Sequence, residues 1–400
     1  MSVFAAVALA PRDPILGLNE QFNADPRTDK VNLGVGVYTD ANGKLPLLGS
    51  VQAAEARLAA HPAARGYLPI DGFAAYVAAA QTQVFGAPSP ALAAKRVASL
   101  QALGGTGALK VGADFLHRLN PRATVWISDP SWENHRALFT HAGFNVRTYA
   151  YYDAPGQGIA FNALLADLGQ AQAGDIVLLH ACCHNPTGYD LTGEQWAAVV
   201  ELIKSRQLLP FMDMAYQGFG QGLDADAQAV RALDAAGLNF LVASSFSKSF
   251  SLYGERVGSL HVVAADADEA ARVLSQIKVT ARTTYSNPPT HGAKVVATVL
   301  TDEELRTQWE QELAGMRDRI AQMRTGLRQA LEAAGVRQPL DFITRQQGMF
   351  SYSGLSAAQM QRLRAEFGVY GVDSGRLCVA ALNAGNLPRV AQAIATVLQG

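Results

Sequence analysis

The 400-residue sequence has few cysteines and few charged side chains. Its three cysteines, Cys182, Cys183 and Cys378, include no CxxC pair, so neither a disulfide framework nor a zinc site is expected. A reducing cytoplasm fits this cysteine usage best. Only 17% of the residues are charged, and 33 basic residues face 34 acidic ones, so the chain lacks the charge that attracts nucleic acid or an anionic membrane. We therefore expect a small molecule as the partner.

Long apolar runs are also missing, and no stretch is long enough to span a bilayer. Residues 1–10 are apolar, but they lack the basic start of a signal peptide. Their Val, Phe and Leu side chains would be poorly placed in water. We therefore expect an N-terminal arm that docks onto a neighbouring subunit.

What the sequence does contain is a repeated alternation of apolar strands and amphipathic helices. The segments are Thr124–Pro130, Val146–Tyr152, Phe161–Ala171, Asp175–Cys183, Gly193–Arg206 and Leu208–Met214. This alternation predicts an α/β fold whose large domain has a mainly parallel sheet covered by helices. From Asp302 to about Ala334 a long polar helix follows, and the rest reads as a smaller α+β domain. We predict an arm at 1–10, a small domain at 11–45 and 303–400, and a large domain at 46–302.

Four candidate functional residues, Trp132, Asn185, Asp213 and Lys248, each follow a strand-like run. Ligands of parallel sheets bind beyond the carboxyl ends of the strands, so these side chains are expected to meet at one edge. A carboxylate such as Asp213 at the end of a buried strand needs a cation, which is either an ion-pair partner or a protonated ring nitrogen. Trp132 is either a core residue or a flat partner for an aromatic ring.

Lys248 lies between hydroxyl side chains and eight residues before Arg256. It is either a solvated loop lysine or an amine that forms an imine with a carbonyl cofactor, while its neighbours hold a phosphate. The glycines around Gly105 and Thr106 open a helix whose free N–H groups suit a phosphate. This segment follows neither the dinucleotide glycine pattern nor the P-loop pattern.

Several segments resemble the aspartate and aromatic amino acid aminotransferases, which are fold type I enzymes that depend on pyridoxal phosphate. The resemblance is carried by SFSKSFSLYGERVG around Lys248, HACCHNPTG from His180 and RxxYSNPPxHGA from Arg282, together with DxAYQGF from Asp213 and GRxxxAxL from Gly375. It runs from about residue 11 to 399. It implies a homodimer in which the active sites are shared between the subunits.

The resemblance assigns a role to each candidate. Lys248 would carry pyridoxal phosphate and move the proton, Asp213 would face the ring nitrogen, and Trp132 would lie on the ring. Asn185 and Tyr216 would bind the phenolic oxygen. The phosphate would be held by Gly105, Thr106, Ser245, Ser247, Arg256 and, from the partner subunit, Tyr67. The substrate would be bound by Gly36, Trp132, Asn185, Arg282 and Arg376. Arg376 would bind the α-carboxylate of the substrate. Arg282 would reach into the active site of the other subunit and bind a side-chain carboxylate of the substrate there. His135, His180 and His184 are expected either to support the site residues from behind or only to pack, and no metal is expected.

The resemblance thus implies transfer of an amino group from aspartate, tyrosine or phenylalanine to 2-oxoglutarate, which gives glutamate. Asn287 and Thr106 look typical of aspartate enzymes, whereas Leu45, which would line the pocket mouth with Thr39 and Gly66, is more apolar than those enzymes prefer. A strictly aromatic preference is therefore an alternative. A decarboxylase or lyase is another, although paired arginines argue against it. A ligand-sensing regulator would need a DNA-binding extension.

Overall fold

The computed structural model describes residues 2–10, 12–13 and 15–399. Its centre is a seven-stranded sheet with the strand order β2-β10-β9-β8-β7-β3-β4. In that order the strands are Val97–Leu103, Val257–Val263, Phe240–Ser245, Leu209–Met214, Ile176–His180, Thr124–Asp129 and Asn145–Ala150. β10 is antiparallel to both of its neighbours, and the pairs from β9 to β4 are parallel. The predicted mainly parallel sheet is confirmed.

The strands are apolar on both faces because helices cover both sides of the sheet. In β7, Ile176 and Leu178 join one buried cluster and Val177 and Leu179 join another, as the period of two in a strand requires. Helices α5 (Gly104–Leu119), α6 (Glu133–His141) and α11 (Ala267–Thr284) cover the first face. The second face is covered by α3 (Ala74–Phe85), α4 (Pro90–Ala93), α7 (Phe161–Leu168), α8 (Gly193–Arg206) and α10 (Gln228–Ala235).

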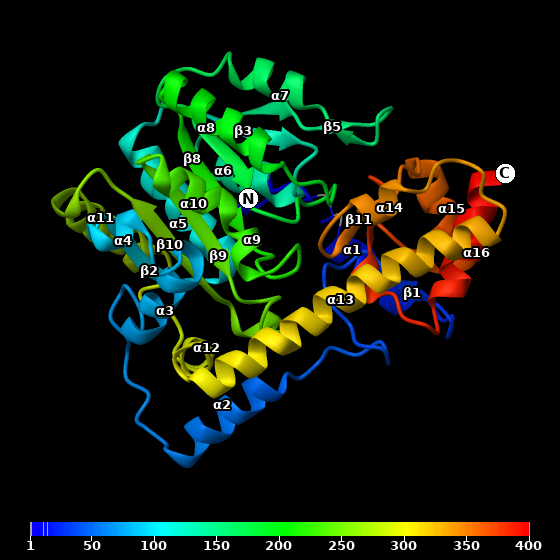
Figure 1. The fold of residues 1–400 in the computed structure, drawn as a ribbon, viewed down its shortest axis with the longest axis horizontal. Helices are drawn as coiled ribbons and strands as arrows, with labels where there is room; N and C mark the ends of the chain where they lie inside the picture. The colour runs from blue at the N-terminus through cyan, green and yellow to red at the C-terminus, as the bar shows by residue number, and fades with distance from the viewer. Residues whose placement is uncertain (1, 11, 14, 400) are drawn as a thin grey trace.

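A long helix, α13 (Glu303–Ala333), runs from the sheet region to the C-terminal part of the chain (Figure 1). Its buried residues Leu305, Trp309, Leu313, Met316 and Ile320 recur every three or four positions, which places them on one face of the helix. Its first turns contact α2 (Gly49–Ala60) and α12 (His291–Thr301). The Trp309 indole donates to the Ser249 carbonyl at 2.8 Å, which ties α13 to the segment that carries Lys248.

The C-terminal part surrounds the far end of α13 with small sheets and helices. Strand β11 (Phe350–Tyr352) pairs antiparallel with β13 (Arg376–Cys378), and β1 (Val31–Asn32) pairs parallel with β12 (Val369–Tyr370). The helices here are α1 (Leu16–Ala24), α14 (Phe342–Arg345), α15 (Ala357–Phe367) and α16 (Leu387–Gln399). The β1–β12 pair brings the N-terminal segment to the C-terminal one, as the predicted small domain requires. The proposed boundary at residue 302 coincides with the start of a helix that contacts both parts, and we keep this division as a proposal.

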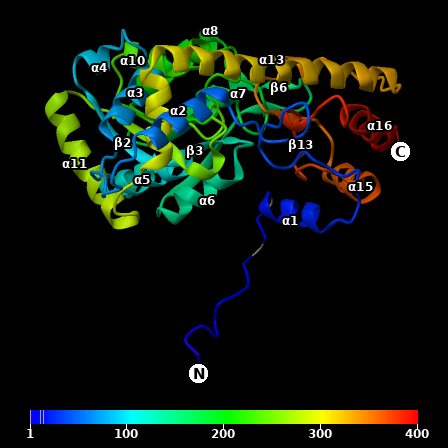
Figure 2. The same ribbon diagram turned by 90° about the horizontal axis from the view of Figure 1, so that it is seen from below.

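Short elements complete the chain. They are β5 (Tyr152–Asp153), β6 (Gly158–Ile159), α9 (Leu223–Asp226) and two 3₁₀ turns at Tyr253–Glu255 and Val379–Ala381. In the described ranges no helix combines the length and apolarity needed to cross a membrane. Residues 2–10 extend away from the body (Figure 2), with Val3, Phe4, Val7 and Leu9 exposed. This exposure is what an arm that docks elsewhere would have, but docking stays a prediction.

Candidate active site

A cavity of about 510 Å³ opens at the carboxyl ends of the central strands. Among the predicted residues, those that line it are Gly36, Gly105, Thr106, Trp132, Asn185, Asp213, Tyr216, Ser245, Ser247, Lys248, Arg256 and Arg376. They come from segments far apart in the sequence. The shared edge of the parallel strands brings them together.

Lys248 follows β9 and points its amine into this cavity. Its Nζ lies 4.6 Å from the centroid of the Tyr216 ring. Burial lowers the pKa of Lys248 to about 8, and the positive charges of Arg256 and Arg376 add to this effect, while Asp213 opposes it. A lysine with a lowered pKa carries more of the neutral, nucleophilic amine near neutral pH than an ordinary lysine does.

Asp213 ends β8 and is held by a buried histidine. The Nε2 of His135 is 2.7 Å from Asp213 Oδ2, and the Nδ1 of the same ring is 2.9 Å from Ser131 Oγ. Burial by itself would raise the pKa of Asp213, but the hydrogen bond with His135 and the nearby positive charges outweigh it and lower the pKa. Asp213 therefore stays a carboxylate that can face a cation in the cavity.

Two further histidines lie close to Asn185, and one of them, His180, also lines the cavity. The backbone N–H of Asn185 donates to His180 Nδ1 at 3.1 Å, and His184 bonds Ser128 and Thr187. Burial lowers the pKa of His180 to about 3, so its ring is neutral at physiological pH. The neutral ring can accept the Asn185 N–H and orient that loop.

A cradle for an anion forms where α5 begins. Gly105 and Thr106 lie in its first turn, where free N–H groups and the helix dipole favour negative charge. Arg256 Nη1 lies 3.4 Å from Ser247 Oγ, so the guanidinium and the hydroxyl share one wall. A Cβ added to Gly104, whose φ is +67°, would come within 2.5 Å of the Arg256 guanidinium. Glycine at this position lets the arginine approach the helix start.

Arg376 lies on the opposite wall and is almost completely buried. Its Nη1 donates to Asn185 Oδ1 at 3.1 Å and its Nη2 donates to the Gly34 carbonyl at 2.8 Å. No carboxylate described in the structure forms an ion pair with it. A buried guanidinium of this kind can bind a ligand carboxylate with both prongs of its fork.

Residues 28–394 match the family described as aminotransferase class I and II. An aspartate aminotransferase from Pseudomonas aeruginosa is 60% identical over 399 residues and covers 100% of both chains. The chain belongs to this family. An aromatic-amino-acid aminotransferase from Escherichia coli is 54% identical, over 99% of this chain and 100% of that one. The crystal structure of an aromatic-amino-acid aminotransferase from Burkholderia pseudomallei, covalently bound to pyridoxal phosphate, has a TM-score of 0.97 at 63% identity over 100% of both chains. The predicted fold type I architecture is therefore confirmed.

Two predicted residues of this aminotransferase do not reach the cavity of their own chain. Tyr67 is 94% exposed, and Arg282 is exposed near the end of α11, where its guanidinium bonds Ser286. Arg282 instead lines an open, mostly apolar hollow together with Ile70 and Val279.

Of the five residues predicted to bear on substrate choice, only one lines the cavity of this chain. Thr106 lines the cavity, but Thr39, Leu45, Gly66 and Asn287 do not. Leu45 is 56% exposed, and a side chain at Gly66 would meet open space. Their part in substrate choice stays a prediction.

The sequence does not predict that Cys182, Tyr253 and Phe350, among other residues, also line the cavity of this aminotransferase. Tyr253 accepts the backbone N–H of Tyr38 at 2.9 Å, and the Phe350 ring lies 4.4 Å from the Arg376 guanidinium. The hydrogen bond between His135 and Asp213 is not predicted by the sequence, which leaves His135 either as a support of the site or as a packing residue. The only local indication of any of these residues is a short strand pattern around Phe350.

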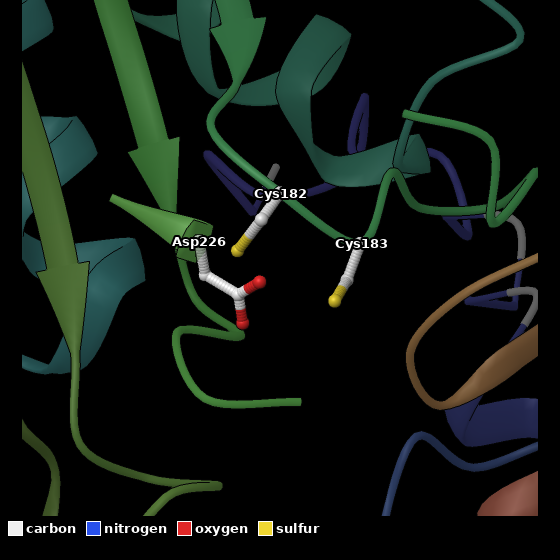
Figure 3. A group of neighbouring side chains, drawn as sticks. All are labelled: Cys182, Cys183 and Asp226. Atoms are coloured by element: carbon white, nitrogen blue, oxygen red, sulfur yellow. The ribbon is translucent and has the colours of Figure 1, made fainter. Parts of the chain in front are cut away.

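Cys182, Cys183 and Asp226 form the one group of three potential metal ligands in the part of the chain that the structure describes (Figure 3). Their ligand atoms lie within 4.8 Å of one another. The Asp226 carboxylate already accepts the N–H groups of Gly218, Gly220 and Gln221 at 2.8 to 2.9 Å. A hydrogen bond with Cys183 and burial raise the pKa of the Cys182 thiol, and a protonated thiol is a poor metal ligand. We therefore assign this group to loop packing.

Proposed function

We propose that this aminotransferase uses pyridoxal phosphate to move the amino group of aspartate and of aromatic amino acids to 2-oxoglutarate. The observation that carries the proposal is the Lys248 amine, which shares one cavity with the Asp213 carboxylate and the anion cradle at α5. A planar aldehyde with a phosphate and a ring nitrogen fits this set of groups. The names of the similar enzymes support both the cofactor and the two substrate classes.

The side chains have distinct tasks in this proposal. When bound, the cofactor supplies an electron sink for the negative charge that develops at the substrate α-carbon. Lys248 would act as general base and acid, taking the proton from the substrate α-carbon and delivering it to the C4′ position of the cofactor, while Asp213 would keep the ring nitrogen protonated. Asn185 and Tyr216 orient the phenolic oxygen, Trp132 supports the ring, and Arg376 holds the α-carboxylate.

Initial rates with aspartate, tyrosine and phenylalanine against 2-oxoglutarate test the function. We expect glutamate from all three amino acids, because Arg376 can bind the α-carboxylate that they share and the aromatic side chains in the cavity wall can accept a ring. Turnover of tyrosine and phenylalanine without aspartate would support the strictly aromatic alternative. Release of carbon dioxide without glutamate would overturn transamination.

The lowered pKa of Lys248 predicts how the cofactor attaches to the apoenzyme. Only the neutral amine attacks an aldehyde, so the attachment rate should rise about tenfold per pH unit below the pKa of about 8 and level off above it. Stopped-flow absorbance between pH 6 and 10 measures this rate. A small lysine derivative, whose amine has a pKa of about 10.4, is the control and should keep rising past pH 9. An enzyme profile that also keeps rising would contradict the assignment of this amine.

We further propose a homodimer with shared active sites, which rests on the resemblance and on where two side chains lie. Tyr67 and Arg282 are exposed, and Arg282 lines an apolar hollow on α11 that a second subunit would cover. In the dimer, Tyr67 would reach the phosphate in the partner's active site, and Arg282 would reach the substrate there.

All three cysteines are free thiols, which supports the proposed cytoplasmic location.

Mixed dimers test the shared sites. Lys248→Ala and Arg282→Ala homodimers should each transaminate aspartate poorly, because every site lacks one of the two residues. A hybrid contains one site with both residues intact, so subunit exchange should restore up to about half of the wild-type activity per hybrid. Differently tagged subunits allow the hybrid to be purified and assayed. Purified hybrids as inactive as the parents would rule out shared sites.

A further inference from the structure

Arg324 is a buried cation with no acidic partner. Its side chain lies on α13, it is 3% exposed, and it forms no ion pair with any carboxylate that the structure describes. Its Nη1 donates to the Ile343 carbonyl at 3.0 Å, and its Nη2 donates to the carbonyls of Gly348, at 2.8 Å, and Phe350. One guanidinium therefore holds the end of α14 and the start of β11 together. Burying an arginine without a counter-charge is costly, so the segment that these bonds hold is expected to matter for function.

The segment that Arg324 holds carries Phe350, whose ring forms part of the cavity wall. The ring lies 4.4 Å from the Arg376 guanidinium and 5.9 Å from the Tyr216 ring, at an interplanar angle of 81°. It also packs against the backbone of Gly36, where an added Cβ would come within 2.7 Å of Phe350 Cζ. Phe350 thus contacts three residues assigned to the cofactor and the substrate.

Arg376 depends on this wall because few hydrogen bonds hold its guanidinium. Its two terminal nitrogens bond one amide and one carbonyl, and its buried Nε has no hydrogen-bond partner. Since no acidic side chain locks the guanidinium, its plane is set by Asn185, Gly34 and the face of the Phe350 ring. A shift of β11 would withdraw the ring and leave the guanidinium free to turn.

We propose that Arg324 is a positioning residue for substrate binding, which fixes Phe350 through its backbone and thereby orients Arg376 toward the substrate α-carboxylate. This inference rests on the proposed role of Arg376 and adds a residue that never contacts the substrate. An arginine suits the task because its planar fork reaches three carbonyls in different directions, which a lysine ammonium on a flexible stem does not reproduce.

The test is Arg324→Met in the holoenzyme, with Arg324→Lys as the conservative variant. Loss of one of the two bonds to the α-carboxylate corresponds to about a tenfold rise in KM. For Arg324→Met we expect that rise in KM for aspartate and phenylalanine alike, while kcat and the cofactor absorbance change little. The KM of Arg324→Lys should lie between those of the wild type and Arg324→Met. The Kd of 3-phenylpropionate, which has a carboxylate but no amino group, should rise in parallel. Arg328→Met is the matched control, since Arg328 lies one turn further along α13 in an exposed pair with Glu332.

A second variant keeps the test decisive if Arg324→Met folds poorly. Phe350→Leu should raise KM by a similar factor, and adding Arg324→Lys to it should change KM little, because both act through the same ring. A merely structural arginine would lower Tm and leave the KM of the folded enzyme unchanged, and that result would overturn the proposal. Fully additive effects on KM would overturn it too. If Arg376→Leu itself leaves KM unchanged, the proposed role of Arg376 in binding the α-carboxylate is wrong. That result can be told apart from one in which only the positioning role of Arg324 is wrong.

Discussion

Replacing Lys248 by alanine is expected to lower kcat by about 10⁴-fold or more, because one amine both attaches the cofactor and moves the α-proton. Proton transfer by a positioned side chain alone contributes roughly 10²- to 10⁴-fold, and the loss of covalent attachment adds to it. The variant should still bind pyridoxal phosphate, since the anion cradle at Gly105, Thr106 and Arg256 is intact. Initial rates and cofactor absorbance measure the two effects separately.

Chemical labelling provides the direct check on this assignment. Borohydride reduction of the wild-type enzyme should fix the cofactor to Lys248, and peptide mapping should find the label there and on no other lysine. Lys110→Ala is the matched control, because Lys110 lies on the same helix as the anion cradle but is paired with Asp114 and does not line the cavity. A label on another lysine, or full turnover in Lys248→Ala, would remove Lys248 from the centre of the proposal.

Replacing Arg376 by leucine is expected to lower kcat/KM for aspartate and phenylalanine alike by about two to four powers of ten. A charge-assisted hydrogen bond contributes roughly 1.5 to 3 kcal/mol, so loss of a two-bond grip costs about 3 to 6 kcal/mol. The loss is shared because every amino acid presents the same α-carboxylate. Arg362→Leu is the control, since Arg362 lies in an exposed pair with Glu366.

Replacing Arg282 by leucine should instead separate the two substrates. Aspartate should lose activity by a similar factor, because its side-chain carboxylate loses its partner. Phenylalanine should be unharmed or improved, since its ring no longer shares the pocket with a charge that must stay hydrated. Measuring kcat/KM for aspartate and phenylalanine in Arg282→Leu and in the wild type tests this prediction. An equal loss for aspartate and phenylalanine would take Arg282 out of the side-chain pocket.

The parallel strands of the sheet and the side chains at their carboxyl ends could be predicted from the sequence alone, whereas the edge strand Val97–Leu103 was not predicted. Apolar runs separated by amphipathic helices are local patterns, and the helix predicted at Gly193–Arg206 has the same bounds in the structure. The residues after these strands could be placed at one edge because parallel strands end on the same side. Lys248, Asp213 and Asn185 therefore meet in the cavity as predicted.

The side chains that orient the predicted site residues could be identified only from the tertiary structure. His135 and Asp213 are 78 residues apart, and Arg376 and Asn185 are 191 apart, so no local pattern reports their hydrogen bonds. The Phe350 ring reaches Arg376 because β11 and β13 pair with Tyr352 opposite Arg376, and that register depends on long-range packing. In the sequence, Arg324 is one of many charged residues on a polar helix, and nothing there indicates that it is buried. Its burial becomes evident only when α13 is packed against the segment from Ile343 to Phe350, because burial is a property of the neighbours and not of the residue.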